Sequence, residues 1–232
     1  MRLVILQPSY LPWLGYFDQM FKSDVFVIYD DVQFDKHGWR NRNRIKTAQG
    51  VQWLTVPVLT KGRNFPLNCD VEINNTAAWQ DKHLKSLKQN YVQAPWFDKS
   101  FAAFEAILQR PFRFLIDLNL ELISAIKNNL RLTTHICRAS ELSVPRSGKT
   151  ERLIEICQKF GADTFLEGEA GQNYIDEALF AQHGIRLEYQ RYQHPIYQQL
   201  HGEFVPYLSI VDLLFNHGSG SLEILTNKKE NS

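Results

Sequence analysis

The sequence predicts an α/β fold: a Rossmann-like, mostly parallel sheet with a β-hairpin insertion and a helical middle segment. Short apolar runs of strand length alternate with helical patterns near both ends of the 232-residue chain. Residues 77–132 instead place apolar side chains at helical spacing, with no strand between the helices. We therefore expect one α/β domain over residues 1–232, in which residues 77–132 form a mainly helical insertion.

Two buried strands and a short helix are predicted at the start of the chain. Residues 2–6 form an apolar run that ends before Pro8, and residues 25–29 form a second apolar run. Residues 14–22 between them have one apolar helical face. Pro12 lies just ahead of this helix, where its missing N–H costs little.

A hairpin and three helices are predicted in the middle of the chain. Residues 44–47 and 51–58 have β-branched side chains and flank a turn at Gly50, which indicates an antiparallel hairpin. Apolar side chains at helical spacing then predict three helices. These helices cover residues 77–91, the segment from after Asp98 to about Gln109, and residues 114–130.

Strands and helices alternate again in the last third of the chain, which is typical of a parallel sheet. Glycines that follow the helical patterns indicate where helices end. The predicted strands are residues 136–139, 164–166 and 185–192, and the predicted helices are residues 149–160, 174–182 and 210–216.

Composition excludes several classes of protein. Hydrophobic residues make up 44% of the chain and charged residues 22%, which is typical of a globular protein. A net charge of +1 argues against a nucleic-acid partner. Three widely spaced cysteines suit a reducing compartment, and no signal peptide or membrane-length apolar run is present. We expect a cytoplasmic protein without membrane insertion.

The first predicted strand ends in polar and aromatic side chains. Open α/β sheets bind ligands outside the carboxyl ends of their strands, and Gln7 and Tyr10 lie at such a place. An amide and a phenol there are suited to bind the edges of a base or sugar. Trp13 and Tyr16 have two interpretations: they pack beneath the sheet, or they join the ligand site. The helix that begins after Pro12 offers free N–H groups for a phosphate.

Asp30 and Asp31 end the second predicted strand. Side chains alternate along a strand, so these two carboxylates are expected to point to opposite sides. One carboxylate would then have a structural role, while the other would bind sugar hydroxyls, an amine or a divalent cation. We favour hydroxyl or amine recognition and catalysis, and no metal site is predicted. A Mg²⁺-bound nucleotide is the alternative, and the cofactor is otherwise unknown.

Three arginines alternate with asparagines just before the predicted hairpin. Arg40, Arg42 and Arg44 would share one face of a strand, and guanidinium groups suit phosphate or carboxylate. The alternative is a solvated edge strand, which charged side chains protect from aggregation. The neighbouring Trp39 favours a ligand-binding face.

Further candidates lie in the last third of the chain. Glu167 ends a predicted strand and would lie on the same edge of the sheet as Gln7, or else in an ordinary polar loop. His194 is a candidate general base because an imidazole titrates near neutral pH, although a lone histidine is more often structural. Tyr197 lies in the same polar aromatic segment and is a candidate substrate-binding residue.

Several well-known signatures are absent or incomplete. Residues 146–150 (RSGKT) resemble the end of a P-loop, but the position of its first glycine is Ser143. A helix cap is therefore favoured there over an anion site. We find no nucleophile elbow, no zinc-ligand spacing and no Gly-x-Gly-x-x-Gly motif.

Four segments resemble the WbqC-like family over almost the whole chain. They are residues 7–17 (QPSYLPWLGYF), 30–34 (DDVQF), 41–45 (NRNRI) and 204–218 (FVPYLSIVDLLFNHG). Members of that family are often associated with gene clusters for O-antigen and other bacterial surface polysaccharides. The resemblance therefore implies a role in polysaccharide assembly and leaves the reaction open. It also makes Gln33, in the second motif, a candidate substrate-binding residue.

A looser likeness connects the opening strand, loop and helix with nucleotidylyltransferases and class I aminoacyl-tRNA synthetases. Those enzymes carry a His-x-Gly-His signature, whereas Trp13, Gly15 and Tyr16 occupy the matching positions here. Both histidines are absent, which argues against adenylyl transfer by the usual mechanism of those enzymes.

Two functional hypotheses follow. The first is an enzyme of surface-polysaccharide biosynthesis that binds an activated or nucleotide-linked sugar and transfers an acyl, aminoacyl or nucleotidyl group. Its candidate catalytic residues are Asp30, Asp31 and His194, and its partners would include other polysaccharide-assembly enzymes. The second is a noncatalytic module that binds a sugar precursor or docks onto a glycosyltransferase.

Overall fold

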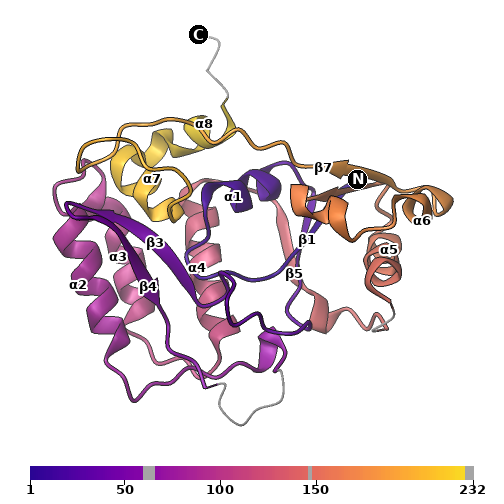
Figure 1. Cartoon of the computed structure of the whole chain (residues 1–232), viewed down its shortest axis with the longest axis horizontal. Coiled ribbons are helices and arrows are strands. Elements are labelled where there is room, and N and C mark those ends of the chain that lie inside the picture. Colours follow the sequence, from indigo (N-terminus) through magenta and orange to yellow (C-terminus); the bar gives the residue numbers. More distant parts are fainter. Residues whose placement is uncertain (60–65, 146–147, 228–232) are drawn as a thin grey trace. The chain divides into compact units, whose positions relative to one another are not determined.

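The computed structural model describes residues 1–59, 66–145 and 148–227. It has a five-stranded parallel sheet, a two-stranded antiparallel hairpin and several helices, so the predicted fold class is confirmed (Figure 1). Arg146 and Ser147 of the partial P-loop lie outside the described residues. No helix within the described ranges is long and apolar enough to cross a membrane.

The chain divides into two compact units. The first, called the sheet unit, contains Met1–Gln7, Asp18–Asp31 and Thr133–Gln193. The second, called the hairpin unit, contains Pro8–Phe17, Val32–Leu132 and His194–Ser232. The organisation as one domain with a helical insertion at residues 77–132 stays a prediction.

The sheet unit contains all five strands of the parallel sheet, in the order β5-β2-β1-β6-β7. From the central strand β1 the chain adds β2 and then β5 on one side, and later β6 and β7 on the other. The strand order therefore reverses between β1 and β6, which is the switch point where such sheets bind ligands. The strands are β1 (Arg2–Leu6), β2 (Val25–Ile28), β5 (His135–Arg138), β6 (Thr164–Glu167) and β7 (Arg186–Tyr189).

The ladder between β1 and β6 ends early. Register pairs join β1 to β2 from Leu3–Val25 as far as Leu6–Ile28, at the end of both strands. Between β1 and β6 the register pairs are only Arg2–Thr164 and Leu3–Phe165. No register pair therefore joins β1 and β6 at their carboxyl ends.

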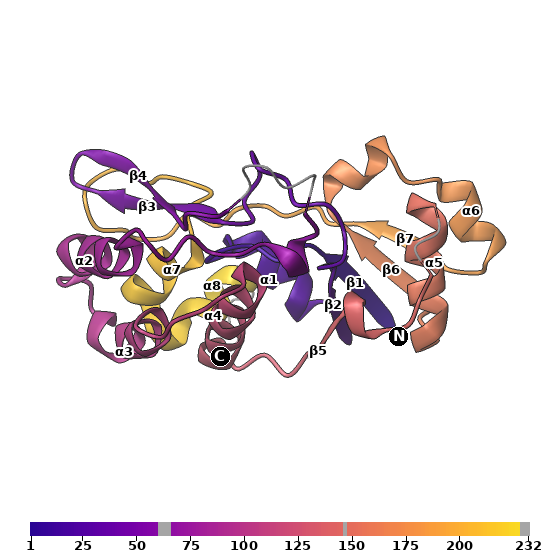
Figure 2. The same cartoon turned by 90° about the horizontal axis from the view of Figure 1, so that it is seen from below.

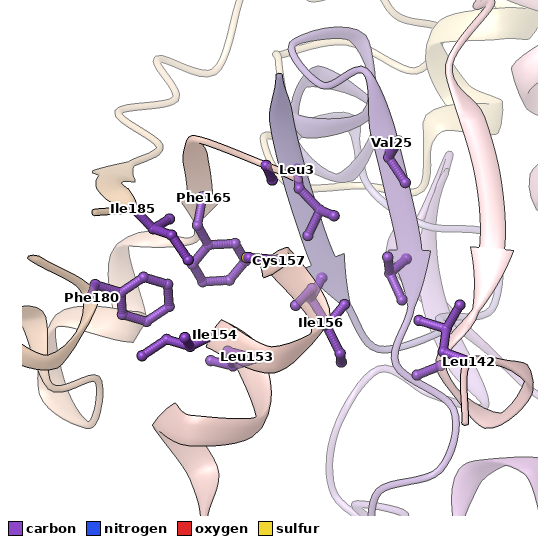
Figure 3. Packing of buried hydrophobic residues seen from close by; sticks show 14 of the residues in the cluster. Leu3, Val25, Leu142, Leu153, Ile154, Ile156, Cys157, Phe165, Phe180 and Ile185 are labelled. Carbon is purple, nitrogen blue, oxygen red and sulfur yellow. The ribbon is translucent and has the colours of Figure 1, made fainter. Parts of the chain in front are cut away.

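The core of the sheet unit lies between the strands and the helices α5 (Lys149–Phe160) and α6 (Glu177–Gln182) (Figure 3). Phe165 of β6 stacks on Phe180 of α6, with ring centroids 5.3 Å apart and planes within 5° of parallel. α5 ends at Gly161, whose φ of 65° suits a residue without a Cβ. α6 begins later than predicted because the Asp176 side chain caps the N–H of Leu179.

The hairpin unit packs helices around Phe215, whose ring contacts Tyr91, Phe97 and Phe104. The hairpin of β3 (Arg42–Thr47) and β4 (Gly50–Thr55) lies against α2 and α7 (Figure 2). The helices are α2 (Trp79–Tyr91), α3 (Phe97–Leu108), α4 (Leu115–Asn129), α7 (Ile210–His217) and α8 (Ser221–Thr226). Helix α1 (Leu14–Phe21) begins in this unit and ends in the sheet unit.

Short 3₁₀ helices connect several of these elements. They are η1 (Asn68–Asp70), η2 (Ala139–Glu141), η3 (Glu169–Asn173) and η4 (Gly218–Gly220). The predicted strand 51–58 ends earlier, at Thr55, and the predicted strand 185–192 is shortened to β7. Helix α8 was not predicted, because Gly218 was interpreted as a stop signal after residues 210–216.

Candidate functional site

Glu167 lies at the carboxyl end of β6, next to the switch point of the sheet. Its side chain is buried, and its Oε1 accepts a hydrogen bond of 2.8 Å from the backbone N–H of Gly168. Burial raises the pKa of Glu167 to about 7, against the opposing effect of this hydrogen bond. A carboxyl group with that pKa can give up and recover a proton near neutral pH, which suits a general acid–base.

The turn after β6 packs directly on Glu167. A Cβ at Gly171 of η3 would come within 2.3 Å of the Glu167 side chain, so this position has room only for glycine. Burial and the nearby charge of Glu167 raise the pKa of Tyr174, in the loop after η3, to about 12. Tyr174 is half exposed, so a protonated phenol lies near the carboxyl group at the surface of the unit.

A network of buried amides lies beside Glu167. Gln190, just after β7, donates its backbone N–H to the Glu167 carbonyl oxygen at 2.8 Å. Its side chain accepts from Gln19 Nε2 at 2.9 Å and donates to Asp18 Oδ2 at 2.7 Å. Gln19 also lies close to Gly168, and its Oε1 is buried with no hydrogen-bond partner among the described residues. A buried amide oxygen without a partner is uncommon in folded proteins.

Asp30 and Asp31 point to different elements. The Asp30 carboxylate is fully buried and accepts hydrogen bonds from Arg138 Nε (2.7 Å), Ser140 Oγ (2.7 Å) and Ser140 N (3.0 Å), at the end of β5. Asp31 forms a buried ion pair with Arg152 of α5. Both carboxylates therefore connect β2 to a neighbouring element of the sheet unit, and their catalytic roles stay predictions. Gln7 is half-buried after β1.

In the hairpin unit, three of the four motif segments bond to one another. Asn43 donates its side-chain N–H to the carbonyl oxygen of Leu11 at 2.7 Å. The backbone N–H of Ser209 donates to Arg44 at 2.8 Å, and that of Ile210 donates to Pro12 at 2.9 Å. Segments from the start, the middle and the end of the chain therefore meet at one place in this unit.

His194 supports a strained turn at this junction. Tyr207 has a φ of 58°, which is uncommon for a residue with a side chain. The Tyr207 backbone N–H donates to His194 Nε2 at 3.1 Å, so Nδ1 carries the proton and donates to the Pro195 carbonyl at 3.0 Å. Burial lowers the pKa of His194, which favours this neutral form. Both ring nitrogens are engaged, and the role of His194 as a base stays a prediction.

Three other predicted residues lie in the interior of the hairpin unit or near its motifs. Tyr10 is fully buried and its hydroxyl lies 2.8 Å from His83 Nδ1. Tyr16 is buried near Arg40, and Arg40 Nη1 donates to the Pro8 carbonyl at 3.1 Å. Arg40 precedes β3, so it does not lie on the strand face expected for all three arginines.

Tyr197 and Gln33 are two further predicted residues. Tyr197 is buried and contributes a hydrogen bond that lowers the pKa of Asp212, although burial raises that pKa overall. Gln33 is exposed and forms an isolated β-bridge with Leu67. The substrate-binding roles of these residues stay predictions. Within the described ranges, no group of three or more His, Cys, Asp or Glu side chains is placed to hold a metal ion.

Comparisons with known proteins agree with the family resemblance of the four motif segments. The model of the WbqC-like protein family matches residues 7–224. The chain belongs to the WbqC-like family. It is also similar to the uncharacterised protein Rv1507c of Mycobacterium tuberculosis, with 39% identity over 226 residues that cover 97% of each chain. No solved structure gives a significant match to this WbqC-like chain.

Sequence reasoning missed the residues that surround Glu167 and Asp31 in this WbqC-like chain. Gln19 and Gln190 are isolated amides in segments predicted to be ordinary helix and strand, so no local pattern marks them. Arg152 had a weak signal, because it lies four residues before Ile156 on the apolar face of α5. A buried arginine on such a face needs an acidic partner, which indicates an ion pair.

The Trp13 ring leaves no room for a side chain at Gly15 in the opening motif. The Trp13 ring lies over Gly15, where an added Cβ would approach ring atoms to 2.2 Å, and also packs against Tyr207 at 5.7 Å between centroids. We expect Gly15→Ala to destabilise the protein by about 1–3 kcal/mol through overpacking. Urea unfolding measures this change, with Gly220→Ala as the control because no atom lies within 4 Å of that site. Equal effects of the two substitutions would contradict the packing argument.

Proposed function

We propose that the sheet unit carries the active site of a group-transfer enzyme of surface-polysaccharide assembly, with Glu167 as its general acid–base. The substrate is an activated or nucleotide-linked sugar. The observation that supports this proposal most strongly is the position of Glu167: a buried carboxyl group at the carboxyl end of β6, where no register pair joins β6 to β1. Such switch points bind ligands in open α/β sheets.

The chemistry of transfer explains why a titrating carboxyl group is needed. When a sugar hydroxyl or amine attacks the carbonyl carbon or phosphorus of a donor, its proton passes to the Glu167 carboxylate as the new bond forms. The same carboxyl group then gives the proton to the leaving group of the donor as the old bond breaks. Its pKa of about 7 suits both steps near neutral pH.

The neighbours of Glu167 supply positioning groups in this proposal. Gln19 and Gln190, whose side chains bond to each other, hold the end of β6 in place through the Glu167 backbone. Gln7, just after β1, binds a polar edge of the substrate, while Asp30 and Asp31 tie the end of β2 to neighbouring elements. The family association with polysaccharide gene clusters supports a sugar substrate, and the proposal places the reaction in the cytoplasm beside other assembly enzymes.

A substrate screen followed by a variant tests the proposal. Purified protein is screened by thermal shift against nucleotide-sugars, sugar 1-phosphates and acyl donors, and products of the stabilising pairs are identified by mass spectrometry. We expect Glu167→Gln to retain binding and to lower kcat by about 10²–10⁴-fold. Glu169→Gln is the matched control, because Glu169 is exposed on η3 two residues away. Wild-type turnover by Glu167→Gln at pH 7 would refute the assignment.

A noncatalytic binding module is the second candidate. It is favoured by one observation: Asp30, Asp31 and His194, the predicted catalytic residues, all bind structural partners. Binding of a sugar precursor without any product across the whole screen would support the module and exclude the enzyme.

A further inference from the structure

One face of the β3–β4 hairpin exposes aromatic rings beside two arginines. Trp39, in the loop before β3, and Trp53 of β4 have exposed fractions of 41% and 45%. Their ring centroids lie 5.1 Å apart. The guanidinium carbon of Arg42 lies 4.8 Å from the centre of the Trp53 ring, and that of Arg44 lies 5.4 Å from Trp39. We call these four residues the Trp–Arg face.

The alternation of arginine and asparagine in the third motif produces this face. Along β3 successive side chains point to opposite sides of the hairpin. Asn43 points inward and is buried, where it bonds the backbone of the opening loop. Arg42 and Arg44 point outward, and Arg44 lies directly opposite Trp53 in the antiparallel register. The asparagines anchor the strand while the arginines remain at the surface.

The two guanidinium groups have more N–H donors than the hydrogen bonds they form within the described residues. Neither Arg42 nor Arg44 forms an ion pair with any carboxylate among the described residues. Arg42 donates to the carbonyl oxygens of Gly38 and His37, and Arg44 donates to that of Tyr207. Arg44 Nε is buried with no partner in the described part of the chain. Since a guanidinium has five N–H donors, both can also bind an anion.

The loop that carries Trp39 is held firmly. The Trp39 carbonyl accepts the backbone N–H of Tyr10 at 3.3 Å, and the Arg40 carbonyl accepts the side-chain N–H of Asn119 at 2.9 Å. Asn41 donates its side-chain N–H to the Val56 carbonyl at 2.8 Å. A face fixed in this way loses little conformational entropy when a ligand binds.

We propose that the Trp–Arg face is a second binding site, which takes a sugar that bears a carboxylate or phosphate. The anionic group binds to Arg42 and Arg44, whose positive charge has no carboxylate partner among the described residues. The C–H groups of the sugar ring pack on the exposed indoles, which have negative ring faces. A nucleic acid would need a longer basic track than a chain of net charge +1 provides.

The Trp–Arg face belongs to the hairpin unit and Glu167 to the sheet unit, so ligand binding at each can be measured separately. All five tryptophans of the chain, Trp13, Trp39, Trp53, Trp79 and Trp96, belong to the hairpin unit. Tryptophan fluorescence therefore reports on this unit, and failure of the transfer assay would leave the fluorescence result unaffected. The converse also holds, because Glu167→Gln tests the sheet unit alone.

The experiment titrates the full chain with glucuronic acid, glucose 1-phosphate, glucose, uridine monophosphate and inorganic phosphate, and follows tryptophan fluorescence and calorimetric heat. We expect the two acidic sugars to bind, neutral glucose to bind at least tenfold more weakly, and the affinity to fall with added salt. Trp53→Ala and Arg42→Gln should each weaken binding at least tenfold. The matched controls are Val51→Ala, from the same exposed strand, and Arg186→Gln, from β7; they should bind as wild type.

The proposal would be overturned by the absence of saturable binding by both acidic sugars, or by equal binding of glucose and glucuronic acid. Wild-type affinity in Arg42→Gln, or tighter binding of phosphate alone than of either sugar, would overturn it as well. Tighter binding of uridine monophosphate than of both acidic sugars would assign the face to nucleotides instead and refute the sugar. If Trp53→Ala proves unfolded by circular dichroism, Arg42→Gln and the glucose comparison still decide the outcome.

Discussion

Glu167→Gln is expected to stabilise the protein at pH 8 while it removes transfer activity. The pKa of Glu167 is raised from 4.5 to about 7 in the folded chain, so the native state binds more protons than the unfolded state between these values. The contribution of Glu167 to stability is therefore complete below pH 4.5 and falls as the pH rises to 7. Above pH 7 the wild type contains a buried, ionised carboxylate, which the neutral amide avoids.

The size of this effect follows from linkage. A shift from 4.5 to about 7 corresponds to at most about 3 kcal/mol, and the cost of burying an amide lowers the expected gain to about 1–3 kcal/mol. Urea unfolding at pH 5 and pH 8 measures it: the variant should gain stability relative to wild type only at the higher pH. Glu169→Gln, on the exposed turn, should show no such pH-dependent gain. A gain of the same size at both pH values would contradict the ionised state assigned to Glu167.

A gain in stability with a loss of activity is the behaviour of a residue kept for function. Proteins retain destabilising groups at active sites because the chemistry requires them, and substitution of such groups commonly stabilises the fold. A buried Glu167 without a catalytic role would give the same gain in stability at pH 8, because burial alone raises its pKa, but it would leave turnover unchanged. The paired measurement of stability and turnover therefore separates the enzyme from the binding module.

The strands β1 and β2 could be predicted because each is a short apolar run with clear ends. β1 and β2 are buried on both faces, and Pro8 and Asp30 mark where these runs end. The exact bounds were less predictable, since α6 begins at a side-chain cap and not at the first helical residue of the pattern. Helix α8 was missed because Gly218 lies in a short turn between α7 and α8. A glycine after a helical pattern indicates that the helix ends, but it does not show whether another helix follows.

The candidate sites were predictable only where a single segment determines them. Glu167 was found because it ends a predicted strand, and the outward direction of Arg42 and Arg44 follows from alternation along β3. Trp53 was not connected with those arginines, since the pairing depends on the register of the hairpin. Arg40 was assigned to the same face, but the strand begins only at Arg42. Contacts across distant segments are set by tertiary packing and leave no local pattern.

The buried ion pair between Asp31 and Arg152 gives the second large expected effect. The two residues are 121 positions apart, and both side chains are almost fully buried. Arg152→Met should destabilise the protein by about 3–5 kcal/mol, because it leaves the Asp31 carboxylate buried without its cation. Arg110→Met breaks the exposed pair with Glu121 and should cost less than about 1 kcal/mol, which makes it the control.

A double-mutant cycle then decides between the two roles of Asp31. If the pair is structural, Asp31→Asn with Arg152→Met should cost much less than the sum of the single substitutions, because no uncompensated charge remains. The double variant should then fold and keep the turnover that depends on Glu167. If Asp31 is instead a catalytic carboxylate, the double variant regains stability but has no activity, because Asn cannot accept the proton. Stability alone could not distinguish these cases, whereas stability and turnover measured on the same four proteins assign Asp31 either to the fold or to the reaction.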